Sequence, residues 1–195
     1  MSLQDKVALV TGSGSGFGEG IARRFVAGGA KVAVLDRDGD AAARVAKELG
    51  GNALALAADI TVKEEVDAAL AATLAEFGRV DVLVNNAGVG HKPQSAELVD
   101  PDEFERVIGV NIRGVYLMTR AVLPHMKQNG SGVIVNIAST GANRPRPNLA
   151  WYNATKGWVV SATKALAIEL APFNIRVVAL NPVAGETPLL KTFMG

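Results

Sequence analysis

The sequence predicts an α/β protein with a doubly wound parallel sheet between two layers of helices, a three-layer α/β/α arrangement. Short runs rich in β-branched residues alternate with longer Ala-rich amphipathic segments along the 195-residue chain. Strands separated by helices of this length pair in parallel through right-handed crossovers, which places helices on both faces of one sheet. The chain length and a hydrophobic content of 49% fit one globular domain over residues 1–195.

Six stretches are expected to form strands, at residues 7–11, 31–35, 53–57, 80–85, 132–138 and 175–180. Five helices are expected between them, at residues 18–27, 41–49, 63–77, 102–128 and 150–171. Residues 80–83 and 133–135 are almost continuously apolar, which is typical of strands buried on both faces. The longest irregular stretch, residues 139–149, is rich in Pro, Arg and Asn. We expect it to be a loop at the carboxyl edge of the sheet, where such folds bind ligands.

A glycine-rich turn follows the first expected strand and opens the first helix. It reads T-G-x-x-x-G-x-G and is formed by Thr11, Gly12, Gly16 and Gly18. Glycines let the backbone approach a pyrophosphate, and a helix N-terminus offers free N–H groups and a favourable dipole. The strand–turn–helix context therefore predicts a dinucleotide site rather than a flexible connection. Two further residues of the turn are expected to contact the cofactor, namely Ser15 and Phe17.

Asp36 ends the second expected strand, 18 residues after Gly18. A carboxylate at this place accepts hydrogen bonds from an adenosine ribose and repels a 2′-phosphate. Arg37 follows and could pair with such a phosphate, but the glycine turn contains Ser15 and no basic residue. The sequence therefore favours NAD over NADP.

Tyr152 and Lys156 lie one helical turn apart, and Ser139 lies thirteen residues before the tyrosine. A phenol has an unperturbed pKa of about 10, so a tyrosine that acts as a base near neutral pH needs a stabilised phenolate. A unit charge about 4 Å away at an effective dielectric of about 20 is worth roughly 4 kcal/mol, or about three pKa units. We therefore expect Lys156 to lower the pKa of Tyr152, although this spacing alone is common in helices.

Taken in order, these motifs resemble the short-chain dehydrogenase/reductase family along essentially the whole chain. The resemblance is carried by the glycine turn, Asp59, the N-N-A-G motif at 85–88, Ser139 with Tyr152 and Lys156, and Asn181-Pro182 with Thr187. It implies a Rossmann-type fold and hydride transfer between a nicotinamide cofactor and a secondary alcohol or ketone. In such a reaction Tyr152 exchanges the hydroxyl proton, and Ser139 hydrogen-bonds the substrate oxygen.

The resemblance also implies further roles in cofactor binding and catalysis. Asp59 and Ile60 are expected to flank the adenine, and Thr187 to contact the carboxamide beside Pro182. Lys156 is expected to hold the nicotinamide ribose as well, and Asn111 to anchor a water that relays protons to it. The backbone of three more residues is expected to line the cofactor cleft, namely Asn86, Ala87 and Gly88.

The sequence departs from the family pattern in two places. Val183 follows Asn181-Pro182 where the family often has glycine, so the backbone near the nicotinamide is expected to differ slightly. Family members usually continue beyond the position of Gly195 through a substrate-covering segment and a seventh strand. We therefore expect the sequence to be a fragment that lacks its C-terminal lid, last strand and tail, because an unpaired sixth strand would be an aggregation hazard.

Composition excludes several other classes of protein. The formal net charge of +1, with scattered Lys and Arg, gives no basic surface for nucleic acid. No apolar run reaches transmembrane length and the N-terminal sequence lacks the regions of a signal peptide, so we expect a cytoplasmic protein that contacts no membrane. The absence of cysteine and the presence of only two histidines argue against disulfides and a metal site.

Three functions remain open on the sequence. The first is an NAD-dependent dehydrogenase of a small secondary alcohol or polyol, and the second is a 3-oxoacyl carrier-protein reductase that uses NADPH. The third is a nucleotide-binding module without turnover. Arg144 and Arg146 in the irregular loop could meet an anionic substrate or carrier, or be solvated loop charges. A homodimer or homotetramer is expected because the two longest helices carry surplus apolar residues, Val110, Val115, Leu117, Val122 and Leu123 in one and Trp158, Val159, Val160, Leu166 and Ile168 in the other.

Overall fold

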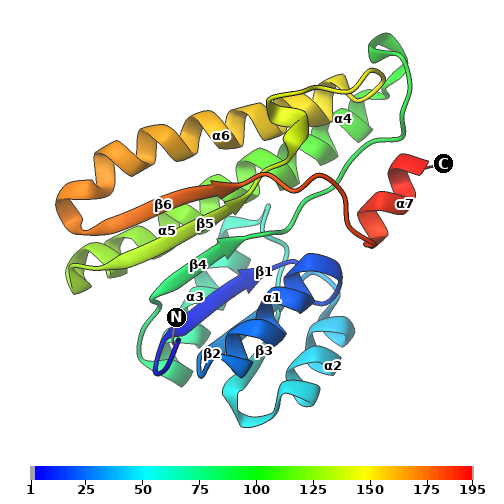
Figure 1. The fold of residues 1–195 in the computed structure, drawn as a ribbon. Coiled ribbons are helices and arrows are strands. Elements are labelled where there is room, and N and C mark those ends of the chain that lie inside the picture. The colour runs from blue at the N-terminus through cyan, green and yellow to red at the C-terminus, as the bar shows by residue number, and fades with distance from the viewer. Residues whose placement is uncertain (1–2, 195) are drawn as a thin grey trace.

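A six-stranded parallel sheet forms the centre of the computed structural model, which describes residues 3–194 (Figure 1). The strand order is β3-β2-β1-β4-β5-β6, and every neighbouring pair is parallel. The order reverses between β1 and β4, and such a switch point opens a crevice at the carboxyl ends of the strands. The strands are β1 Val7–Thr11, β2 Lys31–Asp36, β3 Ala53–Ala57, β4 Val82–Asn85, β5 Gly132–Ile137 and β6 Ile175–Leu180.

Helices cover both faces of this sheet, as the alternating sequence pattern predicts. Helices α1 and α2 pack on one face, and α3, α5 and α6 pack on the other (Figure 1). The α-helices are α1 Gly16–Ala27, α2 Gly39–Leu49, α3 Lys63–Phe77, α4 Pro101–Ile108, α5 Val115–Asn129, α6 Ala150–Leu170 and α7 Pro188–Met194. Short 3₁₀ turns lie at η1 Gly50–Asn52, η2 Ala96–Leu98, η4 Thr140–Ala142 and η5 Ala171–Phe173. Among residues 3–194, no helix combines the length and apolar character that crossing a membrane requires.

The core lies in two layers, one on each side of the sheet. On the α3, α5 and α6 side, large side chains such as Leu83, Met118 and Ile134 are fully buried. On the α1 and α2 side the packed residues are smaller, for example Val34 and Ala42, which lets these helices lie close to the strands. Each fully buried large aliphatic side chain contributes about 1.5–3 kcal/mol, so the strand ends that carry the site are held firmly.

The expected single helix at 102–128 is wrong in one respect, because a π-helical segment interrupts it. This segment, η3 Gly109–Gly114, separates α4 from α5. A Cβ at Gly114 would lie 2.7 Å from Cγ1 of Ile60, so the glycine allows the segment to approach the end of β3. Wider π turns are often found at functional sites, and here the turn carries Asn111, whose contacts are described below.

The expectation that residues 133–135 are buried on both faces is also wrong. Val133 and Val135 are only partly buried, whereas all of β4 is buried. The reason is that α1 and α2 cover β1 to β3, and no described helix covers the same face of β5 and β6. Within residues 3–194, β6 pairs only with β5 and no seventh strand is present. Gly195 lies outside the described residues.

Candidate functional site

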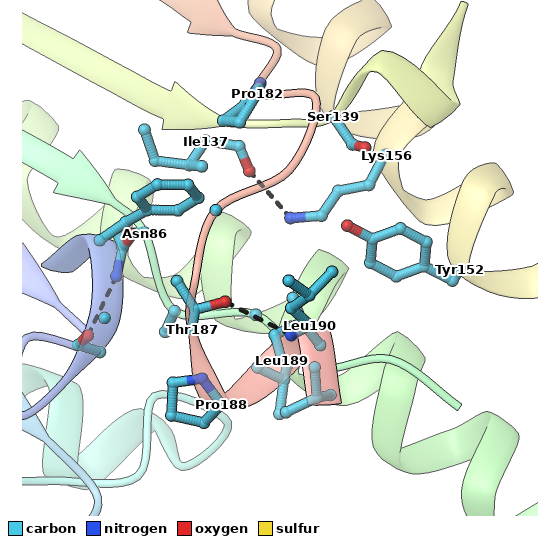
Figure 2. Close-up of a pocket in the computed structure, with 18 of the residues that line it drawn as sticks. Asn86, Ile137, Ser139, Tyr152, Lys156, Pro182, Thr187, Pro188, Leu189 and Leu190 are labelled. Carbon is cyan, nitrogen blue, oxygen red and sulfur yellow. Dashed lines mark hydrogen bonds between the residues drawn. The ribbon is translucent and has the colours of Figure 1, made fainter. Parts of the chain in front are cut away.

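A cavity of about 320 Å³ lies at the carboxyl ends of the strands and joins most of the expected site residues. Its wall runs from the glycine turn after β1, past the ends of β2, β4 and β5, to α6 and α7 (Figure 2). The expected residues that line it are Gly12, Ser15, Gly16, Phe17, Asp36, Asp59, Ile60, Asn86, Ala87, Gly88, Ser139, Tyr152, Lys156, Pro182 and Thr187. Thr11, Gly18 and Asn111 of the expected motifs do not line it.

Close backbone packing sets the shape of the glycine turn. Gly12 and Gly16 have φ values of +62° and +56°, a region that favours glycine. A Cβ at Gly18 would overlap the carbonyl oxygen of Gly12 and lie 2.5 Å from Nδ2 of Asn86. That Nδ2 donates hydrogen bonds to the carbonyl oxygens of Thr11 and Gly12, at 2.9 and 3.0 Å. Gly18 is therefore a packing residue that lets the turn close against β4.

Asp36 supports the same turn from the end of β2. Its Oδ2 accepts a hydrogen bond from the Gly14 N–H at 2.8 Å, and its Oδ1 accepts one from the Asp38 N–H at 3.0 Å. A carboxylate oxygen has room for a second donor, so both oxygens can also accept from a ribose hydroxyl. Asp36 can thus hold the turn and bind a ligand at once.

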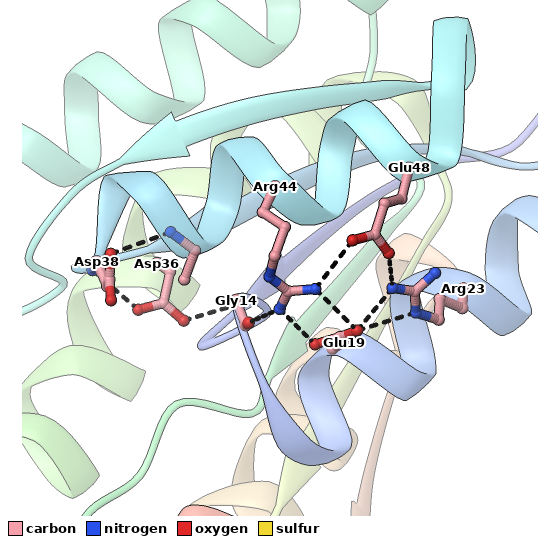
Figure 3. A network of polar contacts seen from close by, with 8 residues as sticks. Gly14, Glu19, Arg23, Asp36, Asp38, Arg44 and Glu48 are labelled. Carbon is pink, nitrogen blue, oxygen red and sulfur yellow. Dashed lines mark hydrogen bonds and ion pairs between the residues drawn. The ribbon is translucent and has the colours of Figure 1, made fainter.

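Sequence reasoning missed a network of ion pairs that holds this turn from behind (Figure 3). Nη2 of Arg44 on α2 donates to the Gly14 carbonyl oxygen and to Glu19 Oε2, both at 2.8 Å. Arg23 bridges Glu19 and Glu48, and Arg44 also reaches Glu48 at 3.3 Å. Hydrogen bonds from Arg44 and then Arg23 lower the pKa of Glu19. The i,i+4 spacings of Glu19 with Arg23 and of Arg44 with Glu48 were the available signal.

Asp59 and Ile60 lie on the cavity wall after β3, as the resemblance implies. Asp59 Oδ1 accepts hydrogen bonds from the N–H and the hydroxyl of Thr61, both at 2.8 Å. The Asp59 N–H donates to Oε2 of Glu65 at 2.7 Å. These contacts fix the backbone here and leave the second carboxylate oxygen of Asp59 available to a ligand.

The expected proton-transfer residues converge at the other end of the cavity. Tyr152 and Lys156 are 6% and 4% exposed, and the Lys156 Nζ lies 5.9 Å from the Tyr152 ring centroid. Nζ donates a hydrogen bond to the Ile137 carbonyl oxygen at 2.8 Å. Ser139 Oγ accepts a hydrogen bond from the Gly141 N–H at 3.0 Å. Figure 2 shows the Tyr152 hydroxyl pointing toward the space that Lys156 and Ser139 border.

In this structure burial has the largest influence on the pKa of Tyr152. Burial raises the pKa of Tyr152, and the smaller influences of the Ser139 hydroxyl and the Arg146 charge act in the opposite direction. Burial also lowers the pKa of Lys156 from 10.5 to about 8. Two buried groups without a counter-ion both favour their neutral forms, so the spacing of Tyr152 and Lys156 alone does not set their pKa values.

Asn111 does not line the cavity, and its side chain makes three hydrogen bonds within the protein. Its Oδ1 accepts from the Val89 N–H at 2.9 Å, and its Nδ2 donates to the Val89 carbonyl oxygen at 2.8 Å. Nδ2 also donates to the hydroxyl of Thr155 at 3.0 Å. Asn111 therefore ties the segment after β4 to α6, next to Lys156.

Helix α7 forms a wall of the cavity that sequence reasoning missed. Leu189, Leu190 and Phe193 line the cavity, and the Phe193 ring centroid lies 4.9 Å from that of Tyr152. Proline is favoured in the first turn of a helix, so Pro188 after Thr187 was a usable start signal. Of the two loop arginines, Arg146 lines this cavity and Arg144 does not.

Comparisons with known proteins agree with this geometry. The family model described as short chain dehydrogenase matches residues 6–194. A 4-formylbenzenesulfonate dehydrogenase of Comamonas testosteroni is 44% identical, over 100% of this chain and 79% of its own length. A 2-(R)-hydroxypropyl-CoM dehydrogenase of Xanthobacter autotrophicus is 41% identical, over 94% of this chain and 76% of its own.

Solved structures confirm the expected Rossmann-type fold. The crystal structure of a 3-ketoacyl-(acyl-carrier-protein) reductase from Brucella melitensis complexed with NADH has a TM-score of 0.98 and 70% identity. The match covers 99% of this chain and 81% of the Brucella melitensis chain. A structure of NAD+-bound xylitol dehydrogenase has a TM-score of 0.90 at 32% identity, covering 94% of this chain and 72% of that one. The family match and these relatives show that the chain belongs to the short-chain dehydrogenase/reductase family of oxidoreductases.

Proposed function

We propose that this protein is an NAD-dependent oxidoreductase that interconverts a secondary alcohol and a ketone, with Tyr152 as acid and base. The main supporting observation is that Asp36, Ser139, Tyr152 and Lys156 line the same cavity. The cavity thus extends from a group that can bind a ribose to a group that can transfer a proton. An enzyme that uses a dinucleotide needs both groups in one cavity. The bound NADH of the similar Brucella melitensis structure supports NAD as the cofactor.

The residues present fit a dinucleotide. Gly12 and Gly16 hold the backbone in the conformation that a pyrophosphate cradle requires, and Asp36 keeps acceptor positions for a ribose. When bound, the nicotinamide supplies the hydride acceptor or donor. We propose these cofactor contacts: Gly12, Ser15, Gly16, Phe17, Gly18, Asp36, Asp59, Ile60, Asn86, Ala87, Gly88, Tyr152, Lys156, Pro182 and Thr187, with Gly18 acting through packing.

The chain's own groups have separate tasks in this reaction. Ser139 Oγ accepts from the Gly141 N–H, and its hydroxyl, which is also within hydrogen-bond reach of Tyr152, has the proton that would be donated to the substrate oxygen. The Tyr152 hydroxyl removes the alcohol proton in oxidation and returns it in reduction. Lys156 uses one of its three donors on Ile137, which leaves two for a ribose or the tyrosine oxygen. Asn111 acts as a positioning residue, because it holds Val89 and Thr155.

Absorbance of NADH at saturating NAD, with a panel of secondary alcohols and polyols, tests the proposal. Tyr152→Phe should lower kcat by about 10²–10⁴-fold, the range for loss of general acid–base catalysis. Tyr116→Phe is the matched control, because Tyr116 is 54% exposed and lies outside the cavity. Undiminished turnover in Tyr152→Phe would sink the mechanism, and a lower KM for NADP than for NAD would overturn the cofactor assignment.

A 3-oxoacyl carrier-protein reductase is the second candidate, favoured by the 70% identity to the Brucella melitensis structure of that name. Efficient reduction of acetoacetyl thioesters, together with poor turnover of free alcohols, would select it. NAD binding by calorimetry without turnover of any substrate would instead select a nucleotide-binding module.

We further infer a single cytoplasmic domain that assembles as a homodimer or homotetramer and acts on a small molecule. Much of the expected apolar surplus on the long helices is buried within the chain, for example Val122 and Val159. Tyr116, Trp158 and Ile168 remain exposed, at 54%, 38% and 78%, and support an assembly surface on α5 and α6. A monomeric sedimentation profile would contradict the oligomer.

A further inference from the structure

Charge is distributed unevenly along the cavity. The acidic residues that line it, Asp36 and Asp59, are those placed at its adenosine end, after β2 and β3. Arg37 also lines the adenosine end, directly after Asp36, and the other two basic lining residues, Lys156 and Arg146, belong to the end that contains Tyr152. The remaining wall near Tyr152 is largely apolar and includes Val89, Leu149, Leu189, Leu190 and Phe193. Within the described residues, the substrate end thus combines positive charge with apolar surface and has no carboxylate.

The backbone of Arg146 is held in place beside Tyr152. Pro145 precedes it and Pro147 follows it, and a residue before proline is restricted to extended conformations. Its carbonyl oxygen accepts a hydrogen bond from Nδ2 of Asn153 at 2.9 Å. Asn153 is buried and directly follows Tyr152 on α6. The base of this side chain is therefore fixed relative to the proton donor.

The guanidinium of Arg146 has no counter-ion among residues 3–194. The ion pairs of this part of the chain involve Arg23, Arg44, Arg79 and Arg106, and Arg146 is absent from them. Its charge nevertheless acts on the catalytic tyrosine, because it lowers the pKa of Tyr152 against the larger effect of burial. Arg146 is thus an unpaired cation within electrostatic reach of the reacting atoms.

We propose that the substrate carries a carboxylate or sulfonate that Arg146 binds, on an apolar body that packs against α7 while its carbinol carbon lies at Tyr152. This inference rests on the proposed oxidoreductase function and names the substrate class. A guanidinium presents paired donors that match two oxyanion oxygens, which makes arginine suited to this recognition. Tyr152 lies directly before Asn153, which holds the backbone of Arg146. One short segment of α6 and the loop before it therefore contact both the anion and the reacting hydroxyl.

A matched pair of alcohols tests the proposal. NAD oxidises 4-(1-hydroxyethyl)benzoate to 4-acetylbenzoate with release of NADH and a proton, and 1-phenylethanol undergoes the same reaction without the carboxylate. We expect kcat/KM to be at least about tenfold higher for the carboxylate substrate. Arg146→Gln should lower this ratio by about 10- to 100-fold, the range expected for a charge-assisted hydrogen bond. Arg146→Lys should restore part of it, because the charge remains but the paired donors do not.

Arg144→Gln is the control for a general loss of loop charge. Arg144 and Arg146 are both exposed and lie two residues apart, but only Arg146 lines the cavity, so the ratio should stay unchanged in the Arg144 variant. An equal effect of both substitutions, or no effect of Arg146→Gln, would overturn the assignment. A 4-acetylbenzenesulfonate and acetophenone pair, measured in the reduction direction, extends the test to the sulfonate.

Further arms separate this inference from the proposed function. If neither alcohol is oxidised, the test is calorimetry of 4-acetylbenzoate binding to the protein saturated with NADH. Weaker binding by Arg146→Gln than by the native protein supports the anion site. No binding by the native protein, or equal binding by both proteins, overturns it. An Arg146 effect seen with acetoacetyl-CoA but not with 4-acetylbenzoate would overturn the small-anion proposal in favour of a phosphate-bearing carrier.

Discussion

Replacing Lys156 with methionine should make the folded protein more stable at neutral pH. Burial lowers the pKa of Lys156 from 10.5 to about 8, which at about 1.4 kcal/mol per pH unit corresponds to a cost of about 3 kcal/mol for the charged form. The substitution removes this cost but also removes the hydrogen bond to the Ile137 carbonyl oxygen, which is worth about 1.5 kcal/mol. We expect a net gain of about 1–2 kcal/mol, together with severe loss of activity.

The sign of the pH dependence follows from the lowered pKa. Below about pH 8 Lys156 is protonated in both the folded and the unfolded state, so its full destabilising cost is present. Between about 8 and 10.5 the unfolded state binds more protons, so the native protein gains stability as the pH rises. Lys156→Met lacks this gain, and its stability advantage should shrink across that window.

Thermal unfolding followed by circular dichroism at pH 7, 9 and 10 provides the measurement. A gain of about 1–2 kcal/mol in a chain of this size raises Tm by roughly 2–8 °C. Lys164→Met on the same helix is the control, because Lys164 is exposed and its replacement should leave Tm nearly unchanged. A Tm at pH 7 that is equal to or below that of the native protein, or an advantage independent of pH, would refute the reasoning.

Three further substitutions test the parts that hold the site. Gly18→Ala should abolish NADH binding in a fluorescence titration, whereas Gly20→Ala on the same helix, where a Cβ meets nothing within 4 Å, should bind normally; equal binding would contradict the packing role. Arg44→Lys should raise KM for NAD several-fold with kcat preserved, and Arg23→Lys, which shares the ion pairs but not the contact with the turn, should not. Asn111→Leu should lower the free energy of unfolding by about 2–4 kcal/mol in urea, because it leaves buried partners unpaired; an unchanged midpoint would refute this.

Local sequence pattern was sufficient for the sheet but not for the helix that carries Asn111. β1 is a nearly continuous apolar run that is buried on both faces, and β6 is a similar run with one face exposed; the sequence located both strands to the residue. Asn111 in the π-helical segment donates hydrogen bonds to Val89 and Thr155, which lie 22 and 44 residues away in sequence. The hydrophobic pattern of residues 102–128 contains no information about contacts with residues distant in sequence. For this reason one continuous helix was expected.

In the candidate site, sequence spacing predicts which residues lie close together, but their pKa values depend on burial. The i,i+4 spacing correctly brought Tyr152 and Lys156 to one cavity. Their pKa values depend on how completely α6, α7 and β5 exclude water, which no pair spacing contains. Helix α7 was missed because it is a single short stretch after an irregular segment, with little periodicity to detect.

The two ends of the cavity differ in the charges that the proposed reaction would use. In our proposals Asp36 at one end disfavours an added phosphate and Arg146 at the other end binds an anion, and the Arg146 charge also lowers the pKa of Tyr152 against the larger effect of burial. An oxyanion held by Arg146 neutralises that charge, so the Tyr152 hydroxyl then keeps its proton to higher pH. A protonated tyrosine is the proton donor for ketone reduction. Because burial already raises the pKa of Tyr152, the tyrosine is protonated near neutral pH with or without the anion, so we expect an anion bound at Arg146 to act on substrate affinity rather than on the direction of proton transfer.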